Sequence, residues 1–463
     1  MEDPGDDGTL RLPLLGESSS EGGGGAGGGA AAGASLSATI FNVLNIYVGL
    51  GLLTMPYACM KGGWAALGFL LVLVPLFATS GQLICRAFDL LPASAPRSYP
   101  ALGAAAAGRA GRRAVLLFCF LELAGASIVL LMVCWQMLEL LLPSEGIGPL
   151  RPMHLAAGIS TACLLPLLLI ELAQLSRLSV LGSTSSLMVI ALALALLGLD
   201  PSRQAMPQQP PPGRHAASIG VLQSIGIFAL SCSAHTTLPA LRSAMRKPSE
   251  FPAALSISFS VMLACYSSLA AAGYWYWGDS ASPLVTTDLA TNSFYVTRRV
   301  PVDRLLAVFV MVNCLSKYPA LNLILQDMVL SILPLLRDSG GSFRPPKRRV
   351  ALALRLVLFA TCALLALTAY DALGSVLSLL GGLCSITCSL ILPTAFYSLL
   401  AWPRLRTPAR VALLALLALA LSLAALITAQ NICFMVPACR RWQQGEQPAV
   451  GSVAGLALRW AQP

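Results

Sequence analysis

The stretch that decides the fold is Asn45-Ile-Tyr-Val-Gly49-Leu-Gly51-Leu-Leu53-Thr-Met-Pro56, which lies inside the first long apolar segment of the chain. Two glycines and a proline fall within eight residues of a segment that is otherwise typical of a membrane-spanning helix. In hydrocarbon, a broken helix leaves backbone N–H and C=O groups without partners, which costs several kcal/mol for each group. Such a break is expected where the chain lines a binding cavity, although a glycine packing notch or a proline kink would leave the same pattern.

A second apolar segment, about residues 217–241, carries a similar interruption. It contains Phe228-Ala-Leu-Ser231-Cys-Ser233-Ala-His235-Thr-Thr237-Leu-Pro239, whose Thr237-Leu-Pro239 repeats the Thr54-Met-Pro56 of the first stretch. Interrupted helices in matching positions of the two halves of a chain are the best sequence indication of a transporter's central site. The pair therefore favours transport more strongly than either motif does alone.

The composition excludes a soluble protein. Of the 463 residues, 56% are hydrophobic and 11% are charged, and the mean hydropathy is +0.75. A soluble domain carries about 25% charged residues. Apolar runs long enough to cross a bilayer recur along the whole chain and leave no room for a soluble catalytic domain. The sequence thus predicts an all-α polytopic membrane protein that lies in a lipid bilayer.

Hydropathy predicts about eleven transmembrane helices. The first covers residue 36 to about residue 60, and the others lie near 64–88, 113–142, 153–171, 178–199, 217–241, 251–277, 303–333, 350–369, 371–401 and 409–433. Residues 36–433 are therefore expected to form one transmembrane domain. Residues 1–35 should form a disordered tail, because their polar, Gly-rich composition cannot bury a core. Residues 434–463 should form a second tail.

The basic residues between the spans indicate the orientation. Most of them fall on the side that carries the N-terminus, with clusters within 109–113, 242–247 and 344–349. By the positive-inside rule the N-terminal tail is cytosolic, and an odd number of spans puts the C-terminal tail in the lumen or outside the cell. The formal net charge of +10 then belongs mostly to cytosolic loops, and no nucleic-acid partner is expected.

The N-terminal tail contains Arg11-Leu-Pro-Leu14-Leu15, which is similar to a dileucine signal for sorting to endolysosomal membranes. Sorting adaptors would be its partners. The alternative is a chance cluster in a tail.

Three ionisable residues, Glu122, Lys317 and His235, lie deep within predicted spans. A charge at the bilayer centre costs at least about 2.5–3.5 kcal/mol unless it is paired or hydrated, so each is a functional candidate. Imidazole changes its charge between about pH 5 and 8, which suits proton handling. The alternatives are that Glu122 and Lys317 are structural ion-pair partners and that His235 only steadies an unwound backbone.

The spans also fit an inverted repeat of five plus five helices, followed by one extra helix. The first and sixth spans carry the breaks. The third and eighth, which are equivalent in such a repeat, are unusually long and carry Glu122 and Lys317. No His or acidic cluster accompanies the scattered cysteines, so neither a metal nor a cofactor is expected.

Motifs along nearly the whole membrane part, about residues 36–433, resemble the amino acid/auxin permease family. Within it, the branch of vacuolar amino acid transporters and the vesicular inhibitory amino acid transporter is the most similar. The motifs are Asn45-x3-Gly49-x-Gly51-x-Leu53-x2-Pro56-Tyr-Ala58, Ser98-Tyr-Pro100, Leu121-Glu-Leu123, Lys247-Pro-Ser-Glu-Phe251-Pro, Gly273-Tyr-Trp-Tyr-Trp-Gly278-Asp279, Lys317-Tyr-Pro319 and Leu377-x2-Leu-Gly381-Gly382.

The resemblance implies the leucine-transporter fold, secondary transport of amino acids and, commonly, proton coupling on acidic intracellular membranes. One departure is Ala234, which stands where relatives often have glycine and leaves the identity of the substrate open.

These observations favour a secondary active, proton-coupled transporter that moves neutral or small amino acids across a lysosomal, vacuolar or vesicular membrane. The substrate would lie against both interrupted segments, at Asn45, Val48, Gly49, Leu50, Gly51, Leu53, Ser231, Ser233, His235 and Thr237. Protons would be handled by Lys317, Glu122 or His235. The Lys317 ammonium can stand where transporters of this fold hold a sodium ion, at carbonyls freed near Gly49.

Two alternatives stay open: a membrane amino-acid sensor with little transport, and a sodium-coupled transporter of the plasma membrane. An enzyme is not expected, because no nucleophile–base or metal constellation is recognisable in the sequence.

Overall fold

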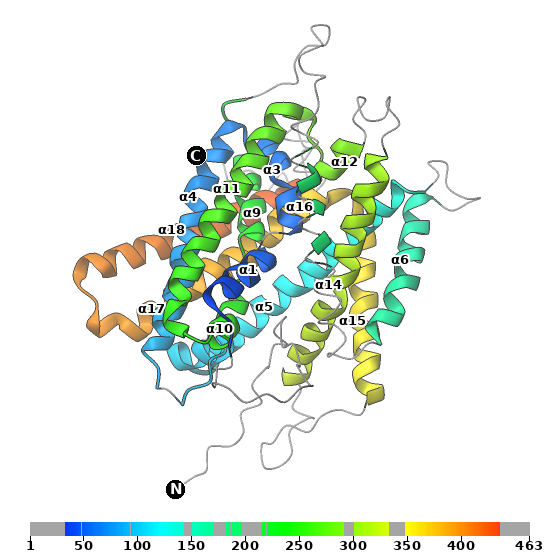
Figure 1. Cartoon of the computed structure of the whole chain (residues 1–463). Coiled ribbons are helices and arrows are strands. Elements are labelled where there is room, and N and C mark those ends of the chain that lie inside the picture. Colours follow the sequence, from blue (N-terminus) through cyan, green and yellow to red (C-terminus); the bar gives the residue numbers. More distant parts are fainter. Residues whose placement is uncertain are drawn as a thin grey trace, which may run out of the picture.

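The computed structural model describes residues 33–47, 49–92, 94–142, 151–169, 215–218, 220–290, 301–332 and 348–435, together with a few residues between 182 and 195. Every regular element in this part of the chain is helical (Figure 1). In chain order the elements, with η marking short 3₁₀ or π-helical turns, are α1 (Leu36–Tyr47), α2 (Leu50–Leu53), α3 (Met55–Gly62), α4 (Trp64–Asp89), α5 (Tyr99–Glu139), α6 (Pro152–Leu168), α9 (Val221–Ser231), η1 (His235–Thr237), α10 (Leu238–Ser243), η2 (Pro248–Glu250), α11 (Phe251–Trp277), η3 (Gly278–Ser280), α12 (Val285–Ala290), α14 (Val302–Ile332), α15 (Arg348–Thr368), η5 (Tyr370–Ala372), α16 (Leu373–Leu380), η6 (Gly381–Ser385), η7 (Thr387–Ile391), α17 (Leu392–Ala401), η8 (Trp402–Arg404) and α18 (Thr407–Met435).

Eight stretches of helix within the described ranges are long and apolar enough to cross a membrane. The shorter apolar helix α6 and the interrupted α1–α3 stretch occupy two further predicted spans. The predicted span near 178–199 lies almost entirely outside the described residues, as do residues 1–32 and 436–463 of the two predicted tails. The polytopic helical architecture is confirmed.

The third span is longer than hydropathy predicts, because α5 begins at Tyr99 and not near residue 113. The hydroxyl of Ser98 accepts a hydrogen bond from the Ala101 amide at 3.4 Å and caps the first turn. At Ala107 and Gly108 the backbone leaves the helical conformation, and the φ of +60° at Gly108 favours glycine. The added segment is a short, Ala-rich helix joined to the span by a kink, and its low hydropathy hides it in the sequence.

Both predicted breaks are present. The first span is divided into α1, α2 and α3 by Gly49 and Thr54, and the sixth into α9, η1 and α10 by residues 232–234. Pro56 and Pro239 lie in the first turn of α3 and α10. Proline is tolerated there because the first helical N–H groups have no intrahelical partner. The prolines thus begin the second half of each broken helix, which confirms the predicted interruption of the first and sixth spans.

The helices pack into two groups that match the inverted repeat. The first, called the broken-helix group, comprises α1–α4 and α9–α11; its members pack against one another. The second, called the scaffold group, comprises α5, α6, α14 and α15, with α5 against α14 as its main interface. The tenth span, α16–η6–η7–α17, lies between them and contacts α4, α5 and α9.

The tenth span contains two consecutive π-helical turns, η6 and η7. π-Helical turns are rare and are frequent at functional sites. This span also packs backbone to backbone against α9, since a Cβ placed on Gly381 would lie 1.7 Å from the carbonyl oxygen of Gly226. Only a residue without a side chain fits there.

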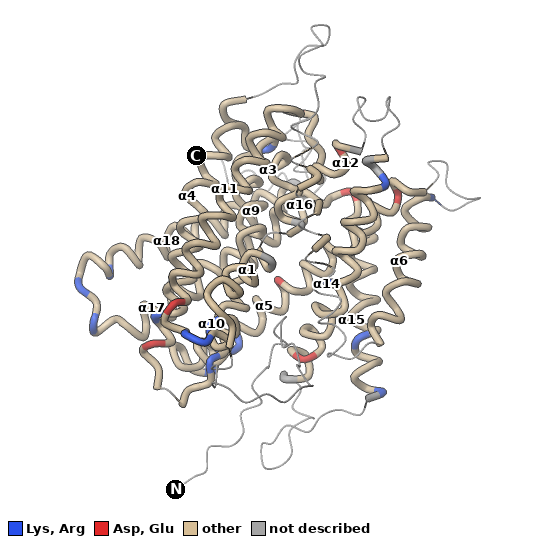
Figure 2. The backbone as a smooth tube through the Cα atoms, viewed as in Figure 1, with Lys and Arg blue, Asp and Glu red and all other residues tan. Residues whose placement is uncertain are grey.

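Most Lys and Arg positions lie toward one end of the helices, opposite to the end that carries α12 (Figures 1 and 2). This end, called the basic end below, carries Arg86 in the last turn of α4, Arg242 in the last turn of α10, Arg349 near the start of α15 and Arg406 between α17 and α18. The asymmetry is the one expected of a membrane protein under the positive-inside rule.

The chain enters α1 at the basic end, next to the end of α10. The Ala34 amide donates to the Ala244 carbonyl at 2.9 Å, and the Arg246 amide donates to the Ala34 carbonyl at 3.0 Å. A Cβ on Gly33, whose φ is +152°, would lie 2.7 Å from the Arg246 nitrogen, so glycine is required. The segment before α1 is therefore joined to the segment after α10.

Candidate substrate and coupling site

The two breaks lie against each other. The Ser231 hydroxyl donates to the Ile227 carbonyl of its own helix at 2.8 Å and also lies 3.4 Å from the Gly51 carbonyl oxygen. A Cβ on Gly51 would lie 2.7 Å from the Ser231 Cβ and 2.9 Å from its Cα, closer than carbon atoms pack. Gly51 thus permits the first and sixth spans to touch where both are unwound.

One tyrosine of α11 bridges the two breaks. The Tyr266 hydroxyl lies 2.7 Å from the Tyr47 carbonyl oxygen, at the end of α1, and 3.0 Å from the Ser231 carbonyl oxygen, at the end of α9. The side chain is fully buried. Tyr266 therefore satisfies carbonyls that the two breaks release. Tyr266 was not identified from the sequence, where it is one of several hydroxyl-bearing residues in the apolar segment 251–277.

Lys317 of α14 reaches the first break. Its Nζ lies 3.2 Å from the position that a Cβ on Gly49 would occupy. The ammonium of the scaffold group thus approaches the point where the first span unwinds, as the sequence predicts for a cation between the first and eighth spans. The neighbouring Val48 and the side chains of Asn45 and Leu50 lie outside the described residues.

Glu122 of α5 reaches the second break. Its Oε1 accepts hydrogen bonds from the Ser233 hydroxyl at 2.5 Å and from the Ser385 hydroxyl at 2.8 Å. The carboxyl group is buried, with 7% of the residue exposed. Both hydroxyl groups donate to the same oxygen, so two hydrogen bonds hold the carboxyl group at the second break.

The π-helical part of the tenth span extends this network. The Ser233 and Ser389 hydroxyl oxygens are 2.7 Å apart, and because Ser233 donates its proton to Glu122, Ser389 is the donor between them. Ser385 and Ser389 are both buried and were not identified from the sequence. A serine in a membrane helix can bond a carbonyl of its own helix, so its presence alone is no signal.

His235 lies behind the break, against α4. Its Nε2 is 2.9 Å from the Phe77 carbonyl oxygen and 3.0 Å from the Ser80 hydroxyl oxygen. A carbonyl can only accept, so Nε2 carries the proton and the hydrogen-bond network assigns this tautomer. The buried Nδ1 has no hydrogen-bond partner among the described residues. The rings of Tyr47, Phe77 and Phe259 surround the imidazole. The contacts of His235 with Phe77 and Ser80 hold η1 against α4.

The other predicted site residues have local roles or cannot be placed. The Thr237 hydroxyl donates to the Ala234 carbonyl at 2.8 Å and stabilises the turn that follows the break. Leu53 packs in the core. Arg11, Leu14 and Leu15 of the predicted sorting signal lie outside the described residues.

The arrangement follows the inverted repeat. The acid of the third span meets the break of the sixth, and the base of the eighth span meets the break of the first. Neither Glu122 nor Lys317 belongs to an ion pair among the described residues. These two charges of the scaffold group thus each face an unwound segment of the broken-helix group.

These features define a membrane protein with interrupted helices around a polar centre, and comparison with solved structures confirms the leucine-transporter-like fold. Two variants of a manganese transporter from Eremococcus coleocola align with a TM-score of 0.51 at 15% identity, over 92% of this chain and 90% of theirs.

The chain belongs to the family described as transmembrane amino acid transporter protein, which it matches over residues 32–433. It is 28% identical to the amino acid transporters AVT1B and AVT1C of Arabidopsis thaliana, over 79% of this chain in both cases. The aligned parts are 64% and 63% of those relatives, so the chain spans just under two thirds of their length. The relative AVT1H of the same plant is also 28% identical, over 80% of this chain and 82% of its own.

Proposed function

We propose that the chain is a secondary active, proton-coupled amino acid transporter whose substrate binds at the two breaks. The observation that carries this proposal is the placement of Lys317 at the first break and Glu122 at the second. Unwound backbone at membrane depth is tolerated where it lines a cavity, and transporters use it to hold substrate. The names of the relatives, all amino acid transporters, support the same class of substrate.

The proposed substrate is a neutral or small amino acid. Backbone carbonyls released at the breaks attract the α-ammonium group, and exposed amides at the beginning of a half-helix attract the α-carboxylate. The described residues nearest to the breaks, Gly49, Gly51, Ser231 and Ser233, are small and carry no charge. Lys317 and Glu122 reach the breaks with opposite charges, so together they add no net charge that would favour a charged substrate side chain.

The proposed coupling ion is the proton. A lysine ammonium beside Gly49 puts positive charge where a sodium ion would have to bind, and the two cations repel each other. A lysine can release its proton, and so can a carboxylic acid held by serine hydroxyls. Lys317 is therefore the first candidate for the titrating group, and Glu122 is the second. His235 is the weaker candidate, because it packs among aromatic rings behind the break.

The proposed location is an acidic intracellular membrane, either vacuolar, lysosomal or vesicular, with the basic end in the cytosol. The asymmetry of Lys and Arg between the two ends supports the orientation (Figure 2). The similarity of Arg11-Leu-Pro-Leu14-Leu15 to a dileucine signal supports sorting by adaptors, with the N-terminal tail as their binding segment.

Uptake into reconstituted vesicles tests the function. The purified chain is placed in liposomes, and a panel of labelled amino acids is offered with an imposed proton gradient or with an imposed sodium gradient. Accumulation driven by protons and indifferent to sodium supports the proposal. Accumulation that requires sodium and ignores pH contradicts it. Binding of an amino acid without accumulation under either gradient identifies a sensor.

A matched pair of carboxyl variants locates the coupling. Glu122→Gln removes the acid at the break, and Glu139→Gln removes an acid at the end of the same helix, where it accepts a hydrogen bond from Tyr370. If Glu122 takes part, only Glu122→Gln changes the pH dependence of uptake. Identical pH profiles of both variants and the unmodified chain would leave Lys317 as the candidate.

A further inference from the structure

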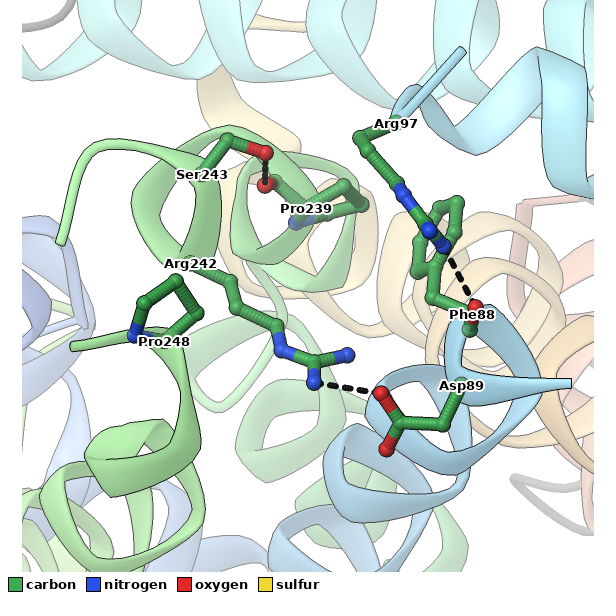
Figure 3. Close-up of a pocket in the computed structure, with 7 residues that line it drawn as sticks. All are labelled: Phe88, Asp89, Arg97, Pro239, Arg242, Ser243 and Pro248. Carbon is green, nitrogen blue, oxygen red and sulfur yellow. Dashed lines mark hydrogen bonds and ion pairs between the residues drawn. The ribbon is translucent and has the colours of Figure 1, made fainter. Parts of the chain in front are cut away.

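A pocket at the basic end lies outside the site described above. It has a volume of about 350 Å³ and is lined by the last turn of α4, by α10 and by the segments around Arg97 and Pro248 (Figure 3). This volume is in the range of small-molecule sites, at its lower end. The break at residues 232–234 does not line this pocket, whose lining in this part of the chain begins at Pro239.

Two guanidinium groups from separate segments point toward the end of α4 in this pocket (Figure 3). Arg242 donates to the Cys85 carbonyl at 2.8 Å and to the Asp89 carboxylate at 2.6 Å. Arg97 donates to the Phe88 and Pro92 carbonyls, the latter at 3.2 Å, and stacks over the Phe88 ring. These bonds hold both planes in place, so their geometry is set before any ligand arrives.

Donors remain on both groups. A guanidinium has five N–H donors, and the bonds above use two on each arginine. The Arg242 Nε is buried and has no partner among the described residues. Because this Nε is closed off from solvent, a ligand in the pocket would be bound by the remaining Nη–H groups of the two arginines.

The charge of the pocket is positive. Arg97 and Arg242 face one acid, Asp89, whose side chain is 60% exposed, so water partly screens its charge. The neighbouring Lys247 pairs with Glu250 outside the lining. The pocket also opens at the basic end, where the positive-inside rule puts the cytosolic leaflet.

From this arrangement we infer that the pocket binds a phosphate group, presented either by an anionic lipid headgroup or by a soluble phosphorylated compound. Planar guanidinium forks match the oxygens of a phosphate, and two forks from different segments can hold one group between them. Basic pockets between helices on the cytosolic side of a membrane are recognised headgroup sites. A bound phosphate would fasten α10, the second half of the broken sixth span, to the segment that precedes α5.

The experiment measures ligand binding to the full chain purified in detergent, by thermal unfolding at increasing ligand concentration. The probes are a short-chain phosphatidylinositol phosphate, the matching soluble inositol phosphate, inorganic phosphate and a short-chain phosphatidylcholine. A ligand that binds only the folded chain raises the melting temperature further as its concentration increases above its dissociation constant. This assay requires no transport, so it is independent of the proposed function.

Arg97→Gln is the main variant and should weaken phosphate binding by about tenfold to a hundredfold, the usual effect of losing hydrogen bonds to a charged group. Arg242→Lys is the second variant; it keeps the charge beside Asp89 but loses the fork, and should weaken binding as well. Arg406→Gln is the control, because Arg406 is exposed at the same end and does not line the pocket.

Each outcome is decisive. Stabilisation by the inositol lipid alone, lost in Arg97→Gln and kept in Arg406→Gln, supports the site with a lipid as its source. Stabilisation by the soluble phosphates as well, with the same dependence on Arg97, supports the site with the phosphate group itself as the determinant. No stabilisation by any phosphate, or an equal response of Arg97→Gln, Arg406→Gln and the unmodified chain, overturns the inference.

Discussion

Replacement of Tyr266 by phenylalanine tests whether the two breaks are held in position by one hydroxyl. The change removes the donor to the Tyr47 and Ser231 carbonyls and keeps the ring, so it opens no cavity in the packing. One hydroxyl proton serves two carbonyls, and its loss leaves at least one buried acceptor without a partner, at a cost of about 1–3 kcal/mol. If substrate binds only when both breaks are held in place, this cost reduces its affinity by about tenfold for each 1.4 kcal/mol.

The measurement is the substrate concentration for half-maximal uptake in proteoliposomes, with thermal unfolding in detergent as the measure of stability. Tyr99→Phe is the matched control, because the Tyr99 hydroxyl is also buried and donates to a backbone carbonyl, that of Cys388 at 2.6 Å, outside the breaks. We expect both variants to lose similar stability and only Tyr266→Phe to lose affinity. Unchanged affinity in Tyr266→Phe, or equal losses in both variants, would refute the role of Tyr266.

Further predictions concern the breaks, the coupling and the α12 end. Gly51→Ala should lose most uptake, because its Cβ would lie 2.7 Å from another side chain and overpacking costs about 1–3 kcal/mol. Gly49→Ala should be milder, since its Cβ would meet only the flexible end of Lys317 at 3.2 Å, and initial uptake rates compare the two variants. Lys317→Arg should fold but lose proton-driven uptake, because guanidinium keeps its proton; full pH-dependent uptake by this variant would make the lysine a permanent structural cation. Burial raises the pKa of Asp288, in α12 and outside the spans, from 3.8 to about 6. The contribution of Asp288 to stability is therefore complete below pH 3.8 and is lost as the pH rises to about 6. The melting temperature of the unmodified chain should fall across this pH window, and the fall should be smaller in Asp288→Asn.

The sequence predicts the breaks and the buried charges because both violate what hydrocarbon allows. Two glycines followed by a proline are unfavourable within a membrane helix, so they indicate a break. A charged residue within an apolar run is equally easy to recognise, as at Glu122 and Lys317. Each feature is local, so one segment suffices to recognise it. The matching positions of the two breaks add the repeat, and with it the expectation that the third and eighth spans face them.

The hydroxyl groups that complete the site are not predictable in this way. Ser385 and Ser389 look like any serines that bond their own helix, and Tyr266 looks like an interfacial ring in an apolar span. Their roles depend on which helices pack together and on the π-helical turns that direct the tenth span toward Glu122. These are properties of packing between distant segments, which periodicity and composition do not record.

The backbone link before α1 has a mechanical consequence. Ala34 is bonded on both sides to the segment that follows α10, so the first half of one broken helix and the second half of the other are fastened together at the basic end. A displacement of either half is transmitted to its counterpart without passing through the polar centre. Tension applied to the chain at Gly33 would therefore load both half-helices at once.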